Sequence, residues 1–218
     1  MNIEKNMTQI WIGPRPAPNK WMNTWKVKHP DWNYSVFTQK DLESRTFYNQ
    51  HLVERYFSLG LFSGVSDLIR YELLYERGGF FPEADFLCLE NTDELFTADP
   101  EYAYTCYEQE RAVPGYVQPI LACNPGNQFV KQLIDELHQL TADQLRYEPW
   151  ESTGNAWLSR MIPKYNPKLV IWPSHFFIPE HFRKAFKYEG KDKVYAQHLW
   201  GSTGGGTNYA YGVDHDSF

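Results

Sequence analysis

The stretch SDLIRYELLYERGGFFPEADFLCL, residues 66–89, decides how this chain is expected to fold. Its first half repeats apolar residues at helical spacing, which predicts a helix over 65–77. Gly78 and Gly79 end that helix, because glycine enters the left-handed conformation at little cost. An apolar strand opens after them, is interrupted by Pro82 and resumes over 86–89. The stretch therefore predicts a helix, a tight turn and a strand, with the acidic segment 83–85 at a strand's end.

Strands and helices alternate along the rest of the chain. Strands are expected over 9–12, 33–38, 102–107, 117–123, 169–172 and 194–199. Helices are expected from Asn19, which can cap the first of them, to Pro30, and over 51–59, 127–140 and 154–162. This alternation predicts an α/β fold in which helices flank a mostly parallel central sheet. We expect one domain over 1–200, followed by a glycine-rich tail or lid over 201–218.

The composition excludes several classes of protein. With 218 residues, of which 42% are hydrophobic, the chain can bury an ordinary core, which excludes wholesale disorder. The net charge of −6 disfavours a primary nucleic-acid binder, so no stable nucleic-acid binding is expected. The 8 Trp, 15 Tyr and 14 Phe suit flat contact surfaces for a sugar or a base. They suit an aromatic core equally well, so composition does not choose between the two.

The cysteines and the apolar runs indicate a compartment. Cys88, Cys106 and Cys123 lie far apart and form no Cys-x-x-Cys pair, so neither a disulfide framework nor a structural zinc site is indicated. No run of about 18 apolar residues could cross a membrane, and the first residues lack the apolar stretch of a signal peptide. A cytoplasmic protein without a transmembrane segment is therefore expected. A phosphate-binding P-loop is excluded, because no Lys-Ser or Lys-Thr follows the glycines.

Two pairs of charged residues in this stretch are candidates for a site. Asp67 and Arg70 share a face of the predicted helix and could hold hydroxyl groups as a fixed acceptor and donor. An ordinary ion pair is the alternative interpretation. Glu83 and Asp85 follow a strand, where ligands of α/β sheets gather, and two hard oxygen ligands suit magnesium or manganese. A solvated acidic turn is the alternative there.

Residues 66–85, SDLIRYELLYERGGFFPEAD, resemble the signature of DXD-type sugar transferases of glycosyltransferase family 32 and their capsular-polysaccharide relatives. Three further segments resemble the family in the same order: QIWIGPRPAPNKWMNTWKVKHPDW (9–32), WESTGNAWLSRM (150–161) and VYAQHLWGST (194–203). Four landmarks in family order are more specific than any single motif. The resemblance implies the GT-A fold, a Rossmann-like domain for nucleotide-diphospho-sugar transfer, distantly similar to clostridial-type glucosylating toxins.

The resemblance also implies roles for the signature residues. Asp85 would be the main metal ligand. Glu83 would lie near the donor ribose and the metal, with Ala84 between the two acids as part of the donor site. Asp67 and Arg70 would hold the transferred sugar, as the corresponding pair does in the clostridial-type toxins.

Residues outside the signature complete the implied site. His198 would close the metal or diphosphate site, with Trp200 beside the bridging phosphate oxygen. The nucleoside pocket would be lined by three consecutive residues, Trp11, Ile12 and Gly13. The turn formed by Ser152, Thr153 and Gly154 would face the acceptor.

The activity implied by the resemblance is a metal-dependent, retaining transfer of a sugar. The donor would be a nucleoside diphosphate sugar, the acceptor a hydroxyl group of a glycan or polysaccharide, and the cofactor manganese or magnesium. The ion would neutralise charge on the departing diphosphate. No general base is nominated, because the departing phosphate oxygen could itself accept the acceptor's proton.

The signature departs from the family at two positions. Glu83 stands where the family has its first Asp and reaches one methylene further, and Pro82 lacks a backbone N–H. We expect the activity to be retained, and aspartate at position 83 to keep or raise it. Two alternatives stay open: a nucleotide-sugar-binding module that no longer transfers, with these positions as the lesion, and a phage- or virus-type enzyme that glycosylates a nucleic acid.

Overall fold

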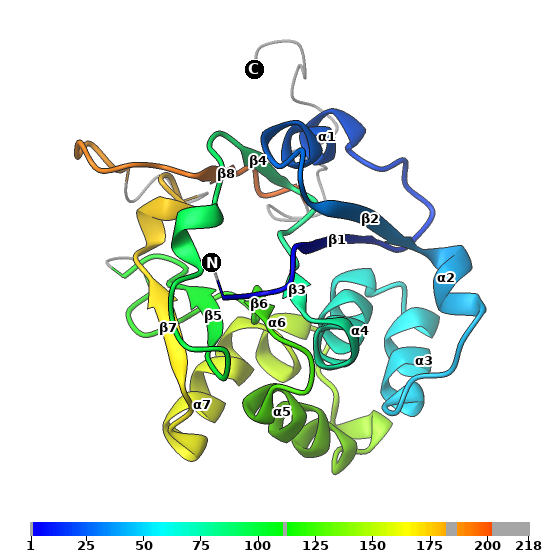
Figure 1. The fold of residues 1–218 in the computed structure, drawn as a ribbon. Helices are drawn as coiled ribbons and strands as arrows, with labels where there is room; N and C mark the ends of the chain where they lie inside the picture. Colours follow the sequence, from blue (N-terminus) through cyan, green and yellow to red (C-terminus); the bar gives the residue numbers. More distant parts are fainter. Residues whose placement is uncertain (1, 111–112, 182–186, 202–218) are drawn as a thin grey trace.

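The computed structural model describes residues 2–110, 113–181 and 187–201 (Figure 1). The strands are β1 (Asn6–Trp11), β2 (Asn33–Thr38), β3 (Gly79–Phe80), β4 (Phe86–Cys88), β5 (Ala103–Cys106), β6 (Ala122–Cys123), β7 (Leu169–Trp172) and β8 (Ala196–His198). The α-helices are α1 (Asn19–Lys28), α2 (Gln39–Glu43), α3 (Gln50–Ser58), α4 (Phe62–Arg77), α5 (Gln128–His138), α6 (Pro149–Ser152) and α7 (Asn155–Tyr165). Short 3-10 turns lie at Asp93–Leu95, Ala142–Gln144 and Ser174–Phe176.

Six strands form the central sheet in the order β2-β1-β3-β6-β5-β7. The pairs β1–β2, β1–β3 and β5–β7 are parallel, and β6 is antiparallel to both of its neighbours. Five strands therefore run in one direction, and the mostly parallel sheet expected from the sequence is confirmed. The remaining strands, β4 and β8, pair antiparallel in a separate ribbon.

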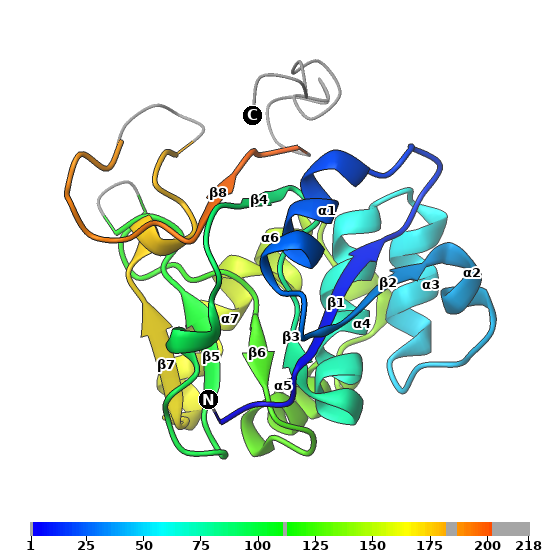
Figure 2. The same cartoon turned by 45° about the horizontal axis from the view of Figure 1, so that its top comes forward.

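The sheet lies between two apolar layers. Helices α3, α4, α5 and α7 cover one face, and α1 with the β4–β8 ribbon lies over the other (Figures 1 and 2). Neighbouring residues on a strand point to opposite faces, so Phe80 packs with Trp25 in one cluster and Phe81 with Leu73 in the other. The aromatic residues thus supply much of the core. All three cysteines are buried and free, as expected from their spacing.

Local patterns predicted most of these elements, with two corrections. A strand over 117–123 is wrong: β6 keeps only Ala122–Cys123, and Val117 makes a single bridge with Tyr107. Pro119 lies in the lost part and has no backbone N–H to give to a ladder. Asn19 does not cap α1, because it is the first residue of the helix and Pro18 precedes it. The proposed tail or lid over 201–218 lies, apart from Gly201, outside the described residues.

None of the helices in the described ranges combines the length and the apolar character needed to cross a membrane.

The glycine pair after α4 brings β3 tightly against β1. Gly78 and Gly79 have φ of 62° and 94°, which is the left-handed region that favours glycine. A Cβ on Gly79 would lie 2.2 Å from the backbone oxygen of Asn6 in β1. Only glycine therefore fits at this position, and the close approach fixes where the acidic segment begins.

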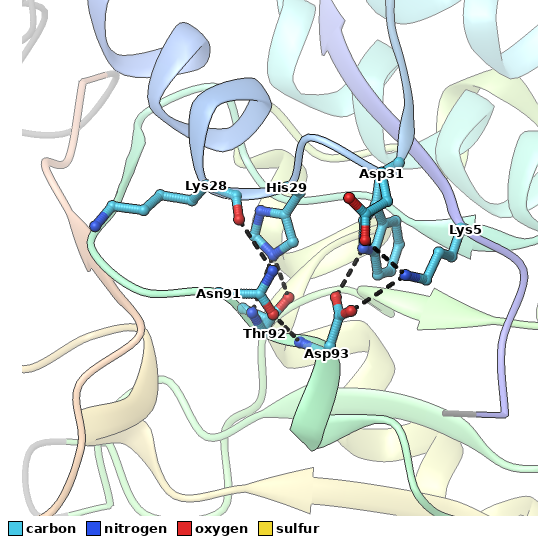
Figure 3. A network of polar contacts seen from close by, with 8 residues as sticks. Lys5, Lys28, His29, Asp31, Asn91, Thr92 and Asp93 are labelled. Atoms are coloured by element: carbon cyan, nitrogen blue, oxygen red, sulfur yellow. Dashed lines mark hydrogen bonds and ion pairs between the residues drawn. The ribbon is translucent and has the colours of Figure 1, made fainter.

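A polar network ties the end of α1 to the segment that follows β4 (Figure 3). The Thr92 N–H donates to His29 Nε2 at 3.0 Å, and Asn91 Nδ2 donates to the carbonyl of Lys28 at 2.9 Å. Lys5 forms ion pairs with Asp31 and Asp93 at the rim of the network. Burial lowers the pKa of His29, in keeping with a neutral ring that accepts a hydrogen bond. The network holds β4, and with it the acidic segment, against α1.

Candidate functional site

The sequence-predicted site residues gather where strands of the central sheet end. Trp11 ends β1 and segment 12–13 follows it, segment 83–85 lies shortly after β3, and β8 brings His198 to the same place by pairing with β4. Ligands of open α/β sheets bind at the carboxyl ends of the strands. Three segments far apart in the sequence therefore meet at one edge of the sheet.

Asp85 is held by residues from the end of the described chain. Its Oδ2 accepts a hydrogen bond from the Gly201 N–H at 2.8 Å and lies 3.2 Å from His198 Nε2. Its backbone carbonyl accepts from the Leu199 N–H at 2.9 Å. The β4–β8 register places Phe86 opposite His198 and so brings these groups together. The side chain of Asp85 is 17% exposed, so it lies at the surface of the site rather than in the core.

The electrostatic surroundings favour an ionised Asp85. Burial by itself would raise the pKa of this carboxyl group, but His198 and the N–H of Gly201 outweigh burial and bring the pKa below its usual value. Asp85 is thus a carboxylate at neutral pH, which is the form that binds cations.

His198 is fixed by aromatic packing. Trp200 stacks on its imidazole, with the ring centroids 3.9 Å apart, and Phe86 meets it edge-on at 4.7 Å. The Trp200 indole in turn donates to the carbonyl of Glu180 at 3.1 Å. Within the described residues, the buried Nδ1 of His198 has no hydrogen-bond partner. This buried polar atom is one that a bound ligand or water would satisfy.

Arg70 forms its ion pair with Glu83. Its Nη1 lies 2.6 Å from Glu83 Oε1, and the arginine side chain is only 2% exposed against 24% for the glutamate. The backbone carbonyl of Glu83 accepts from Gln9 Nε2 at 3.0 Å, and Tyr34 fixes the Gln9 amide through a hydrogen bond of 2.7 Å to its Oε1. Glu83 is therefore tied at both its side chain and its backbone to the helix and to β1.

Asp67 faces the turn 152–154. The Thr153 hydroxyl donates to Asp67 Oδ2 at 3.1 Å, and a Cβ on Gly154 would lie 2.9 Å from the same oxygen. Tyr71 donates to the carbonyl of Thr153 at 2.9 Å and holds the turn against α4. Burial, opposed by Arg70 and reinforced by Glu83, raises the pKa of Asp67 to about 7. This carboxyl group can therefore donate as well as accept a hydrogen bond near neutral pH.

Most of the remaining predicted residues are more buried than their implied roles suggest. Ile12 belongs to the core and Ala84 is 8% exposed. Thr153 is fully buried, with Ser152 nearly so. Trp11 lies partly exposed, and its indole donates to the carbonyl of Arg15 at 2.8 Å. The roles proposed for these positions in binding the nucleoside and the acceptor stay predictions.

Sequence reasoning missed Glu108, which follows β5. Its carboxylate accepts from Asn155 Nδ2 at 2.5 Å and lies 3.7 Å from His181 Nε2, and its side chain is 13% exposed. Glu108 comes directly after the predicted strand 102–107, so the strand-end rule that identified Asp85 could have found it. His181 has no sequence signal of this kind.

The donor set at Asp85 suits a hard divalent cation. The described residues contain no group of three or more His, Cys, Asp or Glu side chains that could hold a metal. The ionised Asp85 carboxylate nevertheless lies 3.2 Å from His198 Nε2, and the ring nitrogen without a partner is the other one, Nδ1. Magnesium in proteins is commonly held by one or two carboxylates, with water and substrate phosphates completing its shell. The Asp85 carboxylate therefore fits such an ion, with the His198 imidazole as a nitrogen donor beside it, whereas Glu83 is engaged in the ion pair with Arg70.

Comparisons with known proteins point to one class. Residues 17–102 match the family model described as a glycosyltransferase sugar-binding region containing a DXD motif. The chain is 25% identical over 198 residues to inositol phosphoceramide mannosyltransferase 3 of Schizosaccharomyces pombe (strain 972 / ATCC 24843), an alignment that covers 84% of this chain and 52% of that protein. The chain thus spans about half the length of the curated relative that it matches.

A solved structure shows a related fold. The PaToxG glycosyltransferase matches with a TM-score of 0.57 and 17% sequence identity, over 74% of this chain and 69% of that chain. The α/β architecture is therefore that of a GT-A glycosyltransferase, as the sequence indicated. The resemblance to DXD-type sugar transferases is confirmed, and the matched segment 17–102 includes Asp67, Arg70, Glu83 and Asp85.

Proposed function

We propose that this protein is a glycosyltransferase that moves a sugar from a nucleoside diphosphate sugar to a hydroxyl acceptor, with retention of the anomeric configuration and a divalent cation as cofactor. The observation that carries the proposal is the ionised Asp85 beside His198 at the carboxyl edge of the sheet. The likeness to sugar transferases at the levels of motif, sequence and fold supports it.

In this proposal Asp85 and His198 hold a manganese or magnesium ion. When bound, the ion supplies positive charge that stabilises the diphosphate as it leaves. Asp85 is suited to the task because its pKa lies below the usual value. Trp200 keeps the imidazole of His198 oriented by stacking on it at 3.9 Å and limits the access of water from that side.

The charged residues on and near α4 orient the sugar. Asp67 and Arg70 lie one helical turn apart, with Arg70 held rigid by its ion pair with Glu83. Asp67, whose pKa is raised to about 7, accepts or donates hydrogen bonds to sugar hydroxyl groups. Positioning of this kind lowers the activation barrier, because the sugar carbon and the acceptor hydroxyl are already close together and correctly oriented. The departing phosphate oxygen takes the acceptor's proton in this scheme.

Donor turnover without acceptor tests the proposal. Purified protein is incubated with nucleotide sugars and manganese, and released nucleoside diphosphate is measured. Slow release is expected for the correct donor. In calorimetry, Asp85→Asn should abolish the manganese-dependent part of donor affinity, whereas Asp143→Asn, at an exposed aspartate of the 3-10 turn Ala142–Gln144, should bind as the wild type does. Unchanged donor affinity in Asp85→Asn would contradict the assignment.

A second candidate is a donor-binding module that no longer transfers. The ion pair with Arg70 favours it, because Glu83 is engaged by a buried cation rather than presented to a metal. This candidate predicts manganese-dependent donor binding with no release of nucleoside diphosphate and no transfer to any acceptor. The same two assays therefore separate the candidates.

A further inference from the structure

A hollow lies next to the site, on the side of Asp67. It has a volume of about 490 Å³ and is lined by Tyr116, Arg146, Trp150, Glu151, Ala156 and Arg160. This volume lies within the range of pockets that hold small molecules. We refer to it as the aromatic–arginine cavity.

The aromatic–arginine cavity shares a wall with the proposed site. Gly154 fills the space between them: a Cβ built on it would lie 3.0 Å from Trp150 Cα and 2.9 Å from Asp67 Oδ2. Trp150 lines the cavity, and Asp67 belongs to the charged group at α4. Only Gly154 therefore separates a molecule in the cavity from the Asp67 carboxyl group, which is proposed to hold the transferred sugar.

The lining combines aromatic rings with excess positive charge. Trp150 is 44% exposed, and nearby Tyr147 is 71% exposed, although large aromatic residues are usually covered. The rings of Tyr116 and Trp150 lie 6.3 Å apart and are tilted by 43°, so they form an angled aromatic surface. Such rings pack against the C–H faces of a sugar. The lining carries two arginines and one glutamate, on a chain whose net charge is −6.

The two guanidinium groups are positioned in different ways. Arg146 forms an ion pair of 2.6 Å with Glu151, which offsets its charge. Arg160 donates through Nη2 to the backbone carbonyl of Glu151 at 2.7 Å, a contact that orients the guanidinium without neutralising it. An oriented guanidinium has further N–H donors and matches the geometry of phosphate and carboxylate groups. Arg160 thus supplies the uncompensated charge of the cavity.

We propose that the aromatic–arginine cavity is the acceptor site and that it binds a sugar ring bearing an anionic group, a phosphate or a carboxylate. The aromatic rings hold the ring of the acceptor, and Arg160 holds its anion. The hydroxyl that receives the transferred sugar then faces Gly154 and Asp67. This inference rests on the proposed transferase function and specifies its acceptor class.

Direct binding tests the inference without relying on turnover. Glucose 6-phosphate, glucuronate and glucose are titrated by saturation-transfer NMR in EDTA, so that no divalent ion carries the anion. At least one charged sugar should bind at least about tenfold more tightly than glucose, which is the difference that one charge-assisted hydrogen bond produces. Arg160→Gln should remove this preference, and Trp150→Ala should weaken both charged and neutral sugars. Arg77→Gln removes an exposed arginine elsewhere and should bind as the wild type does.

Three results would overturn the inference: equal affinity for charged and neutral sugars, an unchanged preference in Arg160→Gln, or an equal loss in Arg77→Gln. Circular dichroism checks that each variant folds, and Arg160→Met replaces Arg160→Gln if the latter does not. Donor hydrolysis by the wild type is measured in parallel. Hydrolysis without charged-sugar preference refutes the acceptor class alone, whereas absence of both donor hydrolysis and manganese-dependent donor binding refutes the proposed function itself.

Discussion

The ion pair between Arg70 and Glu83 should couple the stability of α4 to the acidic segment. Arg70 is almost fully buried, and its Nη1 lies 2.6 Å from Glu83 Oε1. Removing one partner of a buried pair costs about 3–5 kcal/mol, because the other charge remains without its counter-ion. In Arg70→Met the remaining carboxylate is partly exposed and can be hydrated, so we expect about 3 kcal/mol. For a chain of this length this corresponds to a fall in Tm of about 6–12 °C.

The reverse change should cost at least as much. Glu83→Gln leaves a guanidinium that is only 2% exposed without its ion-pair partner, and Asp67 offsets part of this charge, so we expect a loss of about 3–4 kcal/mol. The double variant Arg70→Met/Glu83→Gln should then be more stable than the sum of the single losses allows, by at least about 1 kcal/mol. Urea unfolding with a common m-value gives the four free energies of unfolding. If the loss in the double variant equals the sum of the two single losses to within about 0.5 kcal/mol, the ion pair has no energetic role and the reasoning fails.

The pair also changes what we expect of Glu83→Asp. The sequence alone suggested that this variant keeps or raises activity. Shortening the side chain by one methylene withdraws the carboxylate by about 1.5 Å and stretches the contact beyond ion-pair distance. We therefore expect lower stability, by about 1–2 kcal/mol, and reduced donor turnover. Activity at or above that of the wild type would show that Arg70 does not depend on Glu83.

Further expectations concern titration and backbone geometry. The pKa of Asp67 is raised from 3.8 to about 7, so its ionisation destabilises the fold as the pH rises between these values. The free energy of unfolding of Asp67→Asn, measured in urea, should therefore increase relative to that of the wild type by up to about 4 kcal/mol between pH 4 and pH 8. The lowered pKa of His29 acts in the opposite sense, so the stability of wild type relative to His29→Gln should fall as the pH drops through 6.5, and a difference independent of pH would contradict this. Gly79→Ala should cost about 3 kcal/mol or more, because its Cβ would meet the Asn6 oxygen at 2.2 Å, whereas Gly60→Ala, with a similar φ of 68° and open space around it, should cost only about 1–2 kcal/mol in thermal unfolding.

Local sequence patterns predicted the elements that carry the site. The strand expected over 33–38 is β2, and the one expected over 169–172 is β7. The helix before the glycine pair begins at Phe62, three residues earlier than its periodicity suggested, and ends at Arg77. These features depend on spacing and on the conformational freedom of glycine, which are properties of the nearby residues alone.

Contacts between distant segments did not follow from these patterns. The β4–β8 ribbon brings His198 and Gly201 to Asp85, and such a pairing is chosen by packing across the whole fold rather than by propensity. The ion-pair partner of Arg70 likewise did not follow from local sequence patterns. Helical spacing placed Asp67 on the same face, but the direction and burial of the arginine side chain select Glu83 instead.

The contact between Glu83 and Arg70, which sequence spacing did not predict, explains why glutamate stands at position 83. From the sequence alone, glutamate in place of the first aspartate of the motif indicates a weakened metal ligand. In the structure its extra methylene carries the carboxylate to the buried Arg70, while Asp85 keeps the contacts with His198 and Gly201. A buried guanidinium needs a counter-ion, and an aspartate at position 83 would fall short of it. The two acids thus have separate tasks: Glu83 fixes the helix that presents Asp67, and Asp85 offers its charge to the ligand.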